Sequence, residues 1–95
     1  MLKPEDLFIT ENEFFELVEQ YEKNWLEENR QLPVKDRKQC VQFWIKISEN
    51  LVNPNYIEKL KSLYHEQQWD KVEIEWIDDR TKSLMILLNK NTYNL

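Results

Sequence analysis

Hydrophobic positions repeat at helical spacing over two segments of the chain. From 11 to 30 the apolar side chains recur every three or four residues, after a capping box that begins at Thr10. The same spacing returns over 54–67, where Asn53 is a good N-cap and Pro54 suits the first turn. The pattern therefore predicts one helix over 11–30 and another over 54–67.

The segment between these two helices is apolar on more than one side. Its hydrophobic residues run from Cys40 to Val52, after a proline at position 33 that fits a first helical turn. A helix that is apolar on most sides is usually central. We therefore predict a central helix over 34–52, in which Cys40 and Trp44 are buried.

The hydrophobic period changes from 3.6 to 2 after Trp69. Val72, Ile74 and Trp76 alternate with charged residues, which is the pattern of a half-buried strand. A turn over 78–81 and a return strand follow, so the sequence predicts an antiparallel β-hairpin over about 71–89.

The return strand is apolar on both faces from Leu84 to Leu88, and such a strand needs cover on each face. Three solutions are open: a short third strand from Leu7 to Ile9, the helices on one face with a second copy of the chain on the other, or a partner protein. The predicted fold is a single α+β domain over 1–95, with three helices followed by the hairpin and the short N-terminal strand as an option.

Composition excludes several functional classes. The 95 residues include no glycine, which phosphate-binding loops, dinucleotide fingerprints and nucleophile elbows all need. His65 and Cys40 are the only residues of their types, and they fall in different predicted helices. We therefore expect no enzyme activity, no catalytic residue, no metal site and no cofactor.

The charge is acidic overall but uneven along the chain. The formal net charge is −5, with net −6 over residues 1–30 and net +3 over residues 31–65. An ordered acidic helix can dock on a basic groove of another protein, and exposed Trp and apolar strand residues are typical of interfaces. The candidate partner-binding residues are Glu13, Glu16, Glu19, Glu27, Trp69, Met85 and Leu87.

An alternative hypothesis concerns nucleic acid. Three helices followed by a hairpin is also the element order of a winged helix-turn-helix DNA-binding regulator. In that interpretation the helix over 54–67 is the recognition helix. The residues that would face DNA are Lys59, Lys61, Arg80 and Lys82.

The stretch from Ile9 to Leu17 resembles the first helix of the small acidic immunity proteins that neutralise nuclease bacteriocins. The resemblance covers under a quarter of the chain, and the Tyr-Tyr-Pro binding segment of that family is absent, so no residue role is carried over. In size, acidity and lack of catalytic residues the chain also resembles phage-encoded inhibitors of host enzymes.

The function expected from the sequence is protein binding. We expect a small acidic inhibitor or adaptor that occupies a partner protein's surface, for example a basic nucleic-acid-binding groove. A homodimer through the hairpin is a further expectation. No apolar run has the length of a signal peptide or a membrane span, so a cytoplasmic location without membrane contact is expected.

Overall fold

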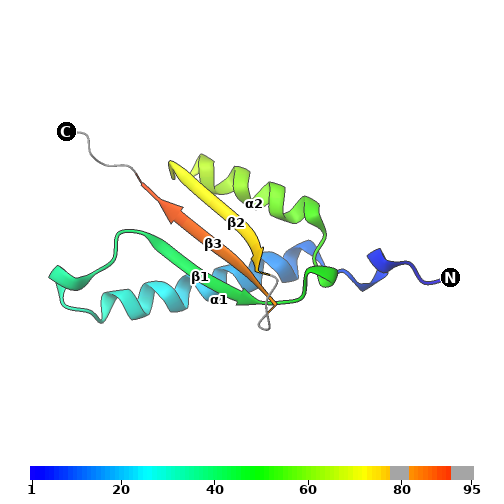
Figure 1. The fold of residues 1–95 in the computed structure, drawn as a ribbon, viewed down its shortest axis with the longest axis horizontal. Helices are drawn as coiled ribbons and strands as arrows, with labels where there is room; N and C mark the ends of the chain where they lie inside the picture. The colour runs from blue at the N-terminus through cyan, green and yellow to red at the C-terminus, as the bar shows by residue number, and fades with distance from the viewer. Residues whose placement is uncertain (78–81, 91–95) are drawn as a thin grey trace.

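The computed structural model describes residues 1–77 and 82–90, and these form an α+β fold, as predicted. Two α-helices and a three-stranded antiparallel sheet make up the described fold (Figure 1). The elements in chain order are η1 (Pro4–Leu7), α1 (Glu11–Arg30), η2 (Val34–Asp36), β1 (Val41–Lys46), η3 (Glu49–Leu51), α2 (Pro54–Glu66), β2 (Lys71–Ile77) and β3 (Ser83–Asn89), where η marks a short 3₁₀-helix.

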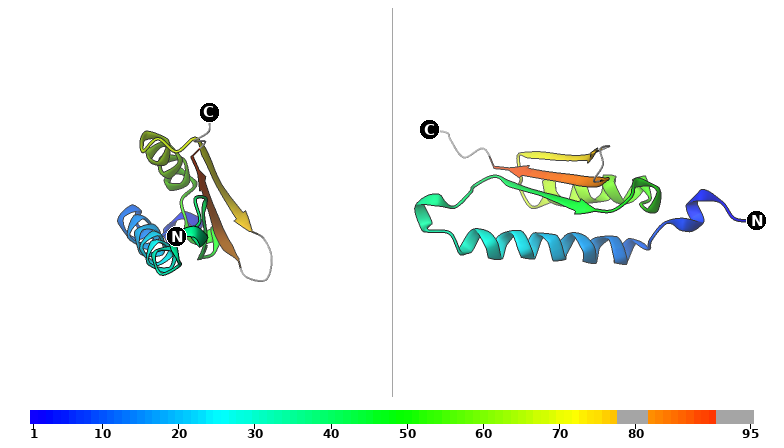
Figure 2. Two further views of the ribbon diagram at one scale, coloured as in Figure 1. Left: turned by 90° about the vertical axis from the view of Figure 1, so that its left-hand side faces the viewer. Right: turned by 60° about the horizontal axis from the view of Figure 1, so that its bottom comes forward.

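The sheet has the strand order β1-β3-β2, so β3 is central and the other two strands are edges. Both helices lie on the same side of the sheet, as Figure 2 shows, and the molecule therefore has two layers. The opposite side, which we call the outer face, carries no described helix. The core lies between the sheet and the two helices.

Side chains alternate across each strand, and the register brings apolar residues of all three strands to the inner face. Ile86 of β3 lies between Phe43 of β1 and Ile74 of β2, and Leu84 lies beside Ile45. All of these residues are buried. The helices contribute further buried side chains to the same cluster, among them Phe14, Val18, Ile57 and Leu60.

The two helices with clear end signals occur where the sequence places them. α1 spans the predicted range, and its capping box is formed: Thr10 Oγ1 accepts a hydrogen bond from the Glu13 amide at 3.1 Å, and Glu13 Oε1 accepts one from the Thr10 amide at 2.9 Å. α2 ends one residue before the predicted limit. The hairpin is also present as β2 and β3, whereas its predicted turn over 78–81 lies outside the described residues.

The prediction of a helix over 34–52 is wrong, because this segment holds η2, β1 and η3. Within β1 the inward residues Phe43 and Ile45 alternate with the outward Gln42, Trp44 and Lys46, which is a period of 2. A strand with apolar side chains on both faces has the same hydrophobic pattern as a buried helix. A short apolar run therefore does not distinguish a strand from a helix.

Three smaller expectations are also wrong. Cys40 is exposed in the connection before β1 instead of buried, and Trp44 is half exposed on the outer face. The third strand is β1 and not the segment 7–9; the Ile9 amide instead donates a hydrogen bond to the Leu51 carbonyl at 2.8 Å.

The turn from α2 into β2 uses a left-handed backbone without glycine. Gln68 has a φ of 71°, its amide donates to the His65 carbonyl at 2.9 Å, and the Trp69 amide donates to the Tyr64 carbonyl at 3.4 Å. This is a Schellman motif, in which glycine is the usual residue at the position that Gln68 occupies. The motif directs the Trp69 side chain back onto the core.

We expect Phe43→Ala and Trp44→Ala to differ sharply in stability, although the two residues are adjacent. Phe43 is buried between sheet and helices, so its truncation should lower the free energy of unfolding by about 3–5 kcal/mol. Trp44 points outward, so its truncation should cost about 1 kcal/mol or less. Urea unfolding measures both values, and equal losses would contradict a strand at this position.

Gln68→Gly should raise the free energy of unfolding by about 1 kcal/mol, because glycine adopts a positive φ without a Cβ clash. The matched control is Gln67→Gly. Gln67 has a φ of −81°, so glycine there adds only backbone entropy to the unfolded state and should destabilise the fold slightly. Thermal unfolding of both variants checks the prediction, and a Gln68→Gly variant no more stable than the parent would argue against it.

Candidate binding groove

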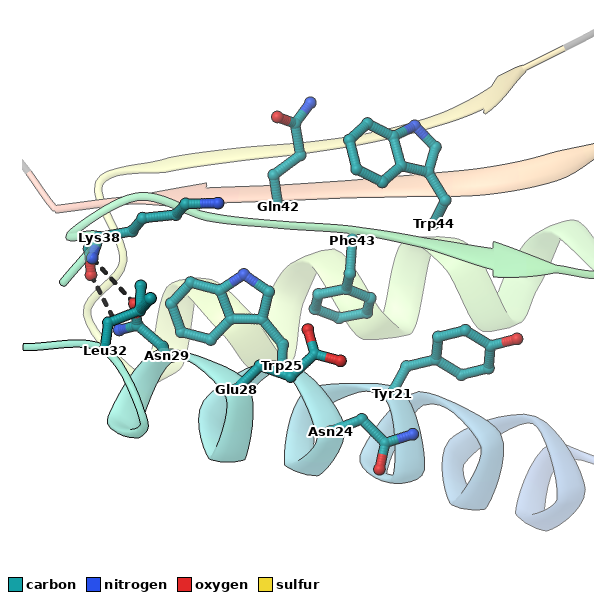
Figure 3. Close-up of a pocket in the computed structure, with 10 residues that line it drawn as sticks. All are labelled: Tyr21, Asn24, Trp25, Glu28, Asn29, Leu32, Lys38, Gln42, Phe43 and Trp44. Carbon is teal, nitrogen blue, oxygen red and sulfur yellow. Dashed lines mark hydrogen bonds between the residues drawn. The ribbon is translucent and has the colours of Figure 1, made fainter. Parts of the chain in front are cut away.

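A groove of about 520 Å³ lies between the second half of α1 and the edge strand β1 (Figure 3). This volume is within the range of small-ligand sites, roughly 300–1,000 Å³. Four aromatic and five polar side chains, together with one leucine, form its walls. The lining residues are Tyr21, Asn24, Trp25, Glu28, Asn29, Leu32, Lys38, Gln42, Phe43 and Trp44.

The aromatic part of the groove comes from both walls. Tyr21 and Trp25 are four residues apart on α1, and Glu28 follows one turn later, so all three project from one side of the helix. From β1, the Phe43 ring stacks on the Tyr21 ring, with 6.5 Å between centroids and 21° between planes. Tyr21 and Trp25 are half-buried, and each keeps part of its ring accessible in the groove.

The groove runs along the free edge of β1. The Lys46 amide donates to Tyr21 Oη at 3.4 Å and therefore points away from β3. Main-chain groups alternate in direction along an antiparallel ladder, so those of Trp44 and Gln42 face the same way. Outside the ladder, neither residue has a main-chain hydrogen bond to the described chain. The edge thus offers free donors and acceptors inside the groove.

The connection between α1 and β1 closes one end of the groove. The Asn29 side chain bonds to both main-chain groups of Lys38: its Oδ1 accepts from the amide at 2.9 Å, and its Nδ2 donates to the carbonyl at 3.1 Å. Arg37 donates to the carbonyls of Leu32 and Arg30 at 3.1 and 3.0 Å, at the C-terminus of α1. These contacts fix where β1 begins relative to the helix.

The groove carries one acid and one base on opposite walls. Figure 3 shows the Glu28 carboxylate reaching into the groove from α1, and the Lys38 side chain extending along the β1 side. Neither side chain forms an ion pair or a side-chain hydrogen bond with the described part of the chain. Both charges are therefore available to a ligand.

The predicted acidic residues lie outside this groove. The Glu13 carboxylate is engaged in the capping box of α1. Glu16, Glu19 and Glu27 are exposed on sides of the helix that do not line the groove. They can set the field around α1, whereas the groove acid, Glu28, was not among the predicted residues.

The predicted apolar contact residues have different surroundings. Trp69 is half-buried and packs against the core at the end of α2. Met85 and Leu87 lie on the outer face of β3, between the edge strands: Met85 pairs with Trp44 on one side and Glu75 on the other. Met85 is only 7% exposed and Leu87 is half-buried, so Trp44, at 50%, is the most exposed hydrophobic side chain of the sheet.

The residues of the DNA-binding alternative have local partners or lie apart. Lys59 forms an ion pair with Glu11 at 2.6 Å, and Lys61 lies 3.8 Å from Glu58. The two lysines are two positions apart on α2, so they point to nearly opposite sides of the helix. Lys82 is exposed beside β3, and Arg80 lies outside the described residues. The second helix that a winged helix requires is replaced by β1.

A second groove lies on the other side of the molecule, next to the edge strand β2. It has a volume of about 770 Å³ and is lined by the segment around Leu7, by η3 and by the side chains Ile57, Ile74 and Trp76. Within residues 1–77 and 82–90, no cluster of three or more potential metal ligands occurs. None of the helices described there has the length and hydrophobicity of a membrane span.

A hydrogen bond between the two helices involves a buried tyrosine whose pKa is raised, chiefly by burial. Tyr64 Oη donates to Glu22 Oε2 at 2.6 Å. Burial disfavours the phenolate, and the hydrogen bond and the negative charge of Glu22 disfavour it further, so the pKa of Tyr64 lies far above its usual range.

This shift predicts a loss of stability at alkaline pH. A folded-state pKa above the unfolded value, about 10, means that the unfolded chain binds fewer protons once the pH exceeds 10. The contribution of Tyr64 is therefore full below about pH 10 and falls as the pH rises further. Tyr64→Phe should unfold about 1–2 kcal/mol more easily at pH 7, and the gap should shrink above pH 10. Urea unfolding across pH 7–11.5 measures this gap; a constant gap would contradict the assignment.

The comparisons with known proteins add no assignment to this geometry. No protein-family model, no curated protein and no solved structure matches the chain.

Proposed function

We propose that this chain is a non-catalytic protein-binding module, which acts as an inhibitor or adaptor by occupying the surface of another protein. The observation that carries the proposal is the exposure of Trp44 at the free edge of the sheet. Its ring lies where the outer face meets the groove, next to main-chain groups that are free to pair. Tryptophan is among the residues that contribute most to protein interfaces.

The charge of α1 supports the same proposal. Residues 11–30 contain seven acids and two bases, and most of the acids are exposed. A surface of one sign attracts a partner of the opposite sign and raises the association rate, and this effect weakens with salt. The module therefore suits a partner with a basic contact surface.

The proposal predicts that Trp44→Ser strongly reduces the capture of a specific partner. Tagged protein would be incubated with lysate of its own host, with and without nuclease treatment, and retained proteins would be compared between variants. We expect a partner held by the parent chain to be reduced at least tenfold with Trp44→Ser, since interface tryptophans contribute about 2 kcal/mol or more. The matched control is Leu63→Ser, because Leu63 is 38% exposed but lies on α2.

The control should retain the partner as the parent chain does. Equal retention by Trp44→Ser, or a partner that is lost after nuclease treatment, would count against binding through this surface.

Glu16→Lys combined with Glu19→Lys should slow association at low salt and have little effect at high salt.

A further inference from the structure

We propose that the groove between α1 and β1 binds an extended peptide segment of a partner protein, which pairs with the free edge of β1 and places an arginine side chain against Trp25 and Glu28. This inference rests on the proposed function, because it names the kind of segment that such a module would engage. Its parts are the strand edge, the aromatic wall and the unpaired acid.

The strand edge accounts for the extended conformation. The main-chain groups of Gln42 and Trp44 face the groove, so a peptide laid along β1 can form a short fourth strand. Pairing stops at Lys46, because its amide already bonds to Tyr21 Oη. At the other end the clamped connection around Lys38 limits the groove. The paired stretch is therefore only a few residues long.

The aromatic wall and the acid account for the arginine. A peptide strand along β1 points alternate side chains toward α1, where Trp25, Tyr21 and Glu28 lie together. A guanidinium group stacks on an aromatic ring and also donates two hydrogen bonds to a carboxylate. Lysine matches the charge but not the flat shape, so arginine fits this wall better.

Charge complementarity extends beyond the single acid. The acids of α1 attract a basic segment toward the groove, and they repel a segment with an acid pointing at the helix. On the opposite wall the Lys38 ammonium group forms no ion pair with the described chain, so it suits an acidic side chain that points away from α1. The preferred segment thus has an arginine toward the helix and tolerates an acid at the alternate positions.

A displayed library of random twelve-residue peptides, selected on the immobilised chain, tests this inference. We expect enrichment of peptides that carry arginine among apolar or β-branched residues. One selected peptide would then be titrated against variants. Glu28→Gln should weaken binding about tenfold or more, because a charge-assisted hydrogen bond is lost. The matched control Glu27→Gln removes the same charge from a neighbouring exposed residue and should change the affinity less than twofold.

Strand addition has its own readouts. Gln42→Pro removes an amide that faces away from β3, which an edge strand tolerates, and it should abolish peptide binding. In the unaltered chain, NMR should show the largest shifts and new exchange protection at the amides of Gln42 and Trp44. Changing the peptide's arginine to lysine should weaken binding severalfold.

Several outcomes would overturn the inference. These are a selection that yields no peptides or peptides without arginine, an unchanged affinity with Glu28→Gln, and amide shifts that map to the groove beside β2. A dimer in light scattering that Gln42→Pro dissociates would show that a second copy occupies the edge. If Trp44→Ser removes the lysate partner while Glu28→Gln and Gln42→Pro do not, protein binding through the outer face stands and strand addition fails. Conversely, if arginine peptides bind as expected and no partner is sensitive to Trp44→Ser, peptide binding in the groove stands and the proposed partner binding through Trp44 fails.

Discussion

The packing of both helices against one face of the sheet, which buries the inward side chains of the central strand β3, determines the rest of the structure. Leu84 and Ile86 are fully buried, and β3 pairs with an edge strand on each side. Because the side-chain period of a strand is 2, a slip of one residue in either ladder would move an edge strand's apolar set to the outer face. The buried inward side chains of β3 therefore determine the register of both edge strands, and hence the position of the groove.

Because both helices lie on one side of the sheet, neither covers the outer face, and one edge of β1 is not paired with another strand of the described chain. The outer face is partly closed by its own side chains, since Met85 lies between Trp44 and Glu75. Among the described residues, the β1 edge is closed at Lys46, where the Tyr21 hydroxyl accepts a hydrogen bond from the amide. Natural sheets usually protect long edges against pairing with other chains. Here the free stretch is short and lies beside an aromatic wall, so it offers little edge for general aggregation.

The sequence predicts the elements whose ends and period are both marked. α1 begins at a capping box, α2 begins at Asn53 and Pro54, and the hairpin is indicated by the change of the hydrophobic period from 3.6 to 2. β1 was missed because six residues are too few to separate a doubly apolar strand from a buried helix. That error also hid the groove: on a helix Trp44 belongs to a core stripe, whereas on a strand it points away from Phe43 and into solvent. Glu28 could be found only once β1 was known to lie opposite it.

The exposed position of Cys40 makes the chain convenient for spectroscopy. It is the only cysteine of the sequence, and it lies two residues before Gln42, where the connection enters β1. A maleimide dye or a nitroxide label would therefore attach at one place without any substitution. Such a label would sit next to the strand edge and would report on its occupancy, while the buried packing around β3 stayed untouched.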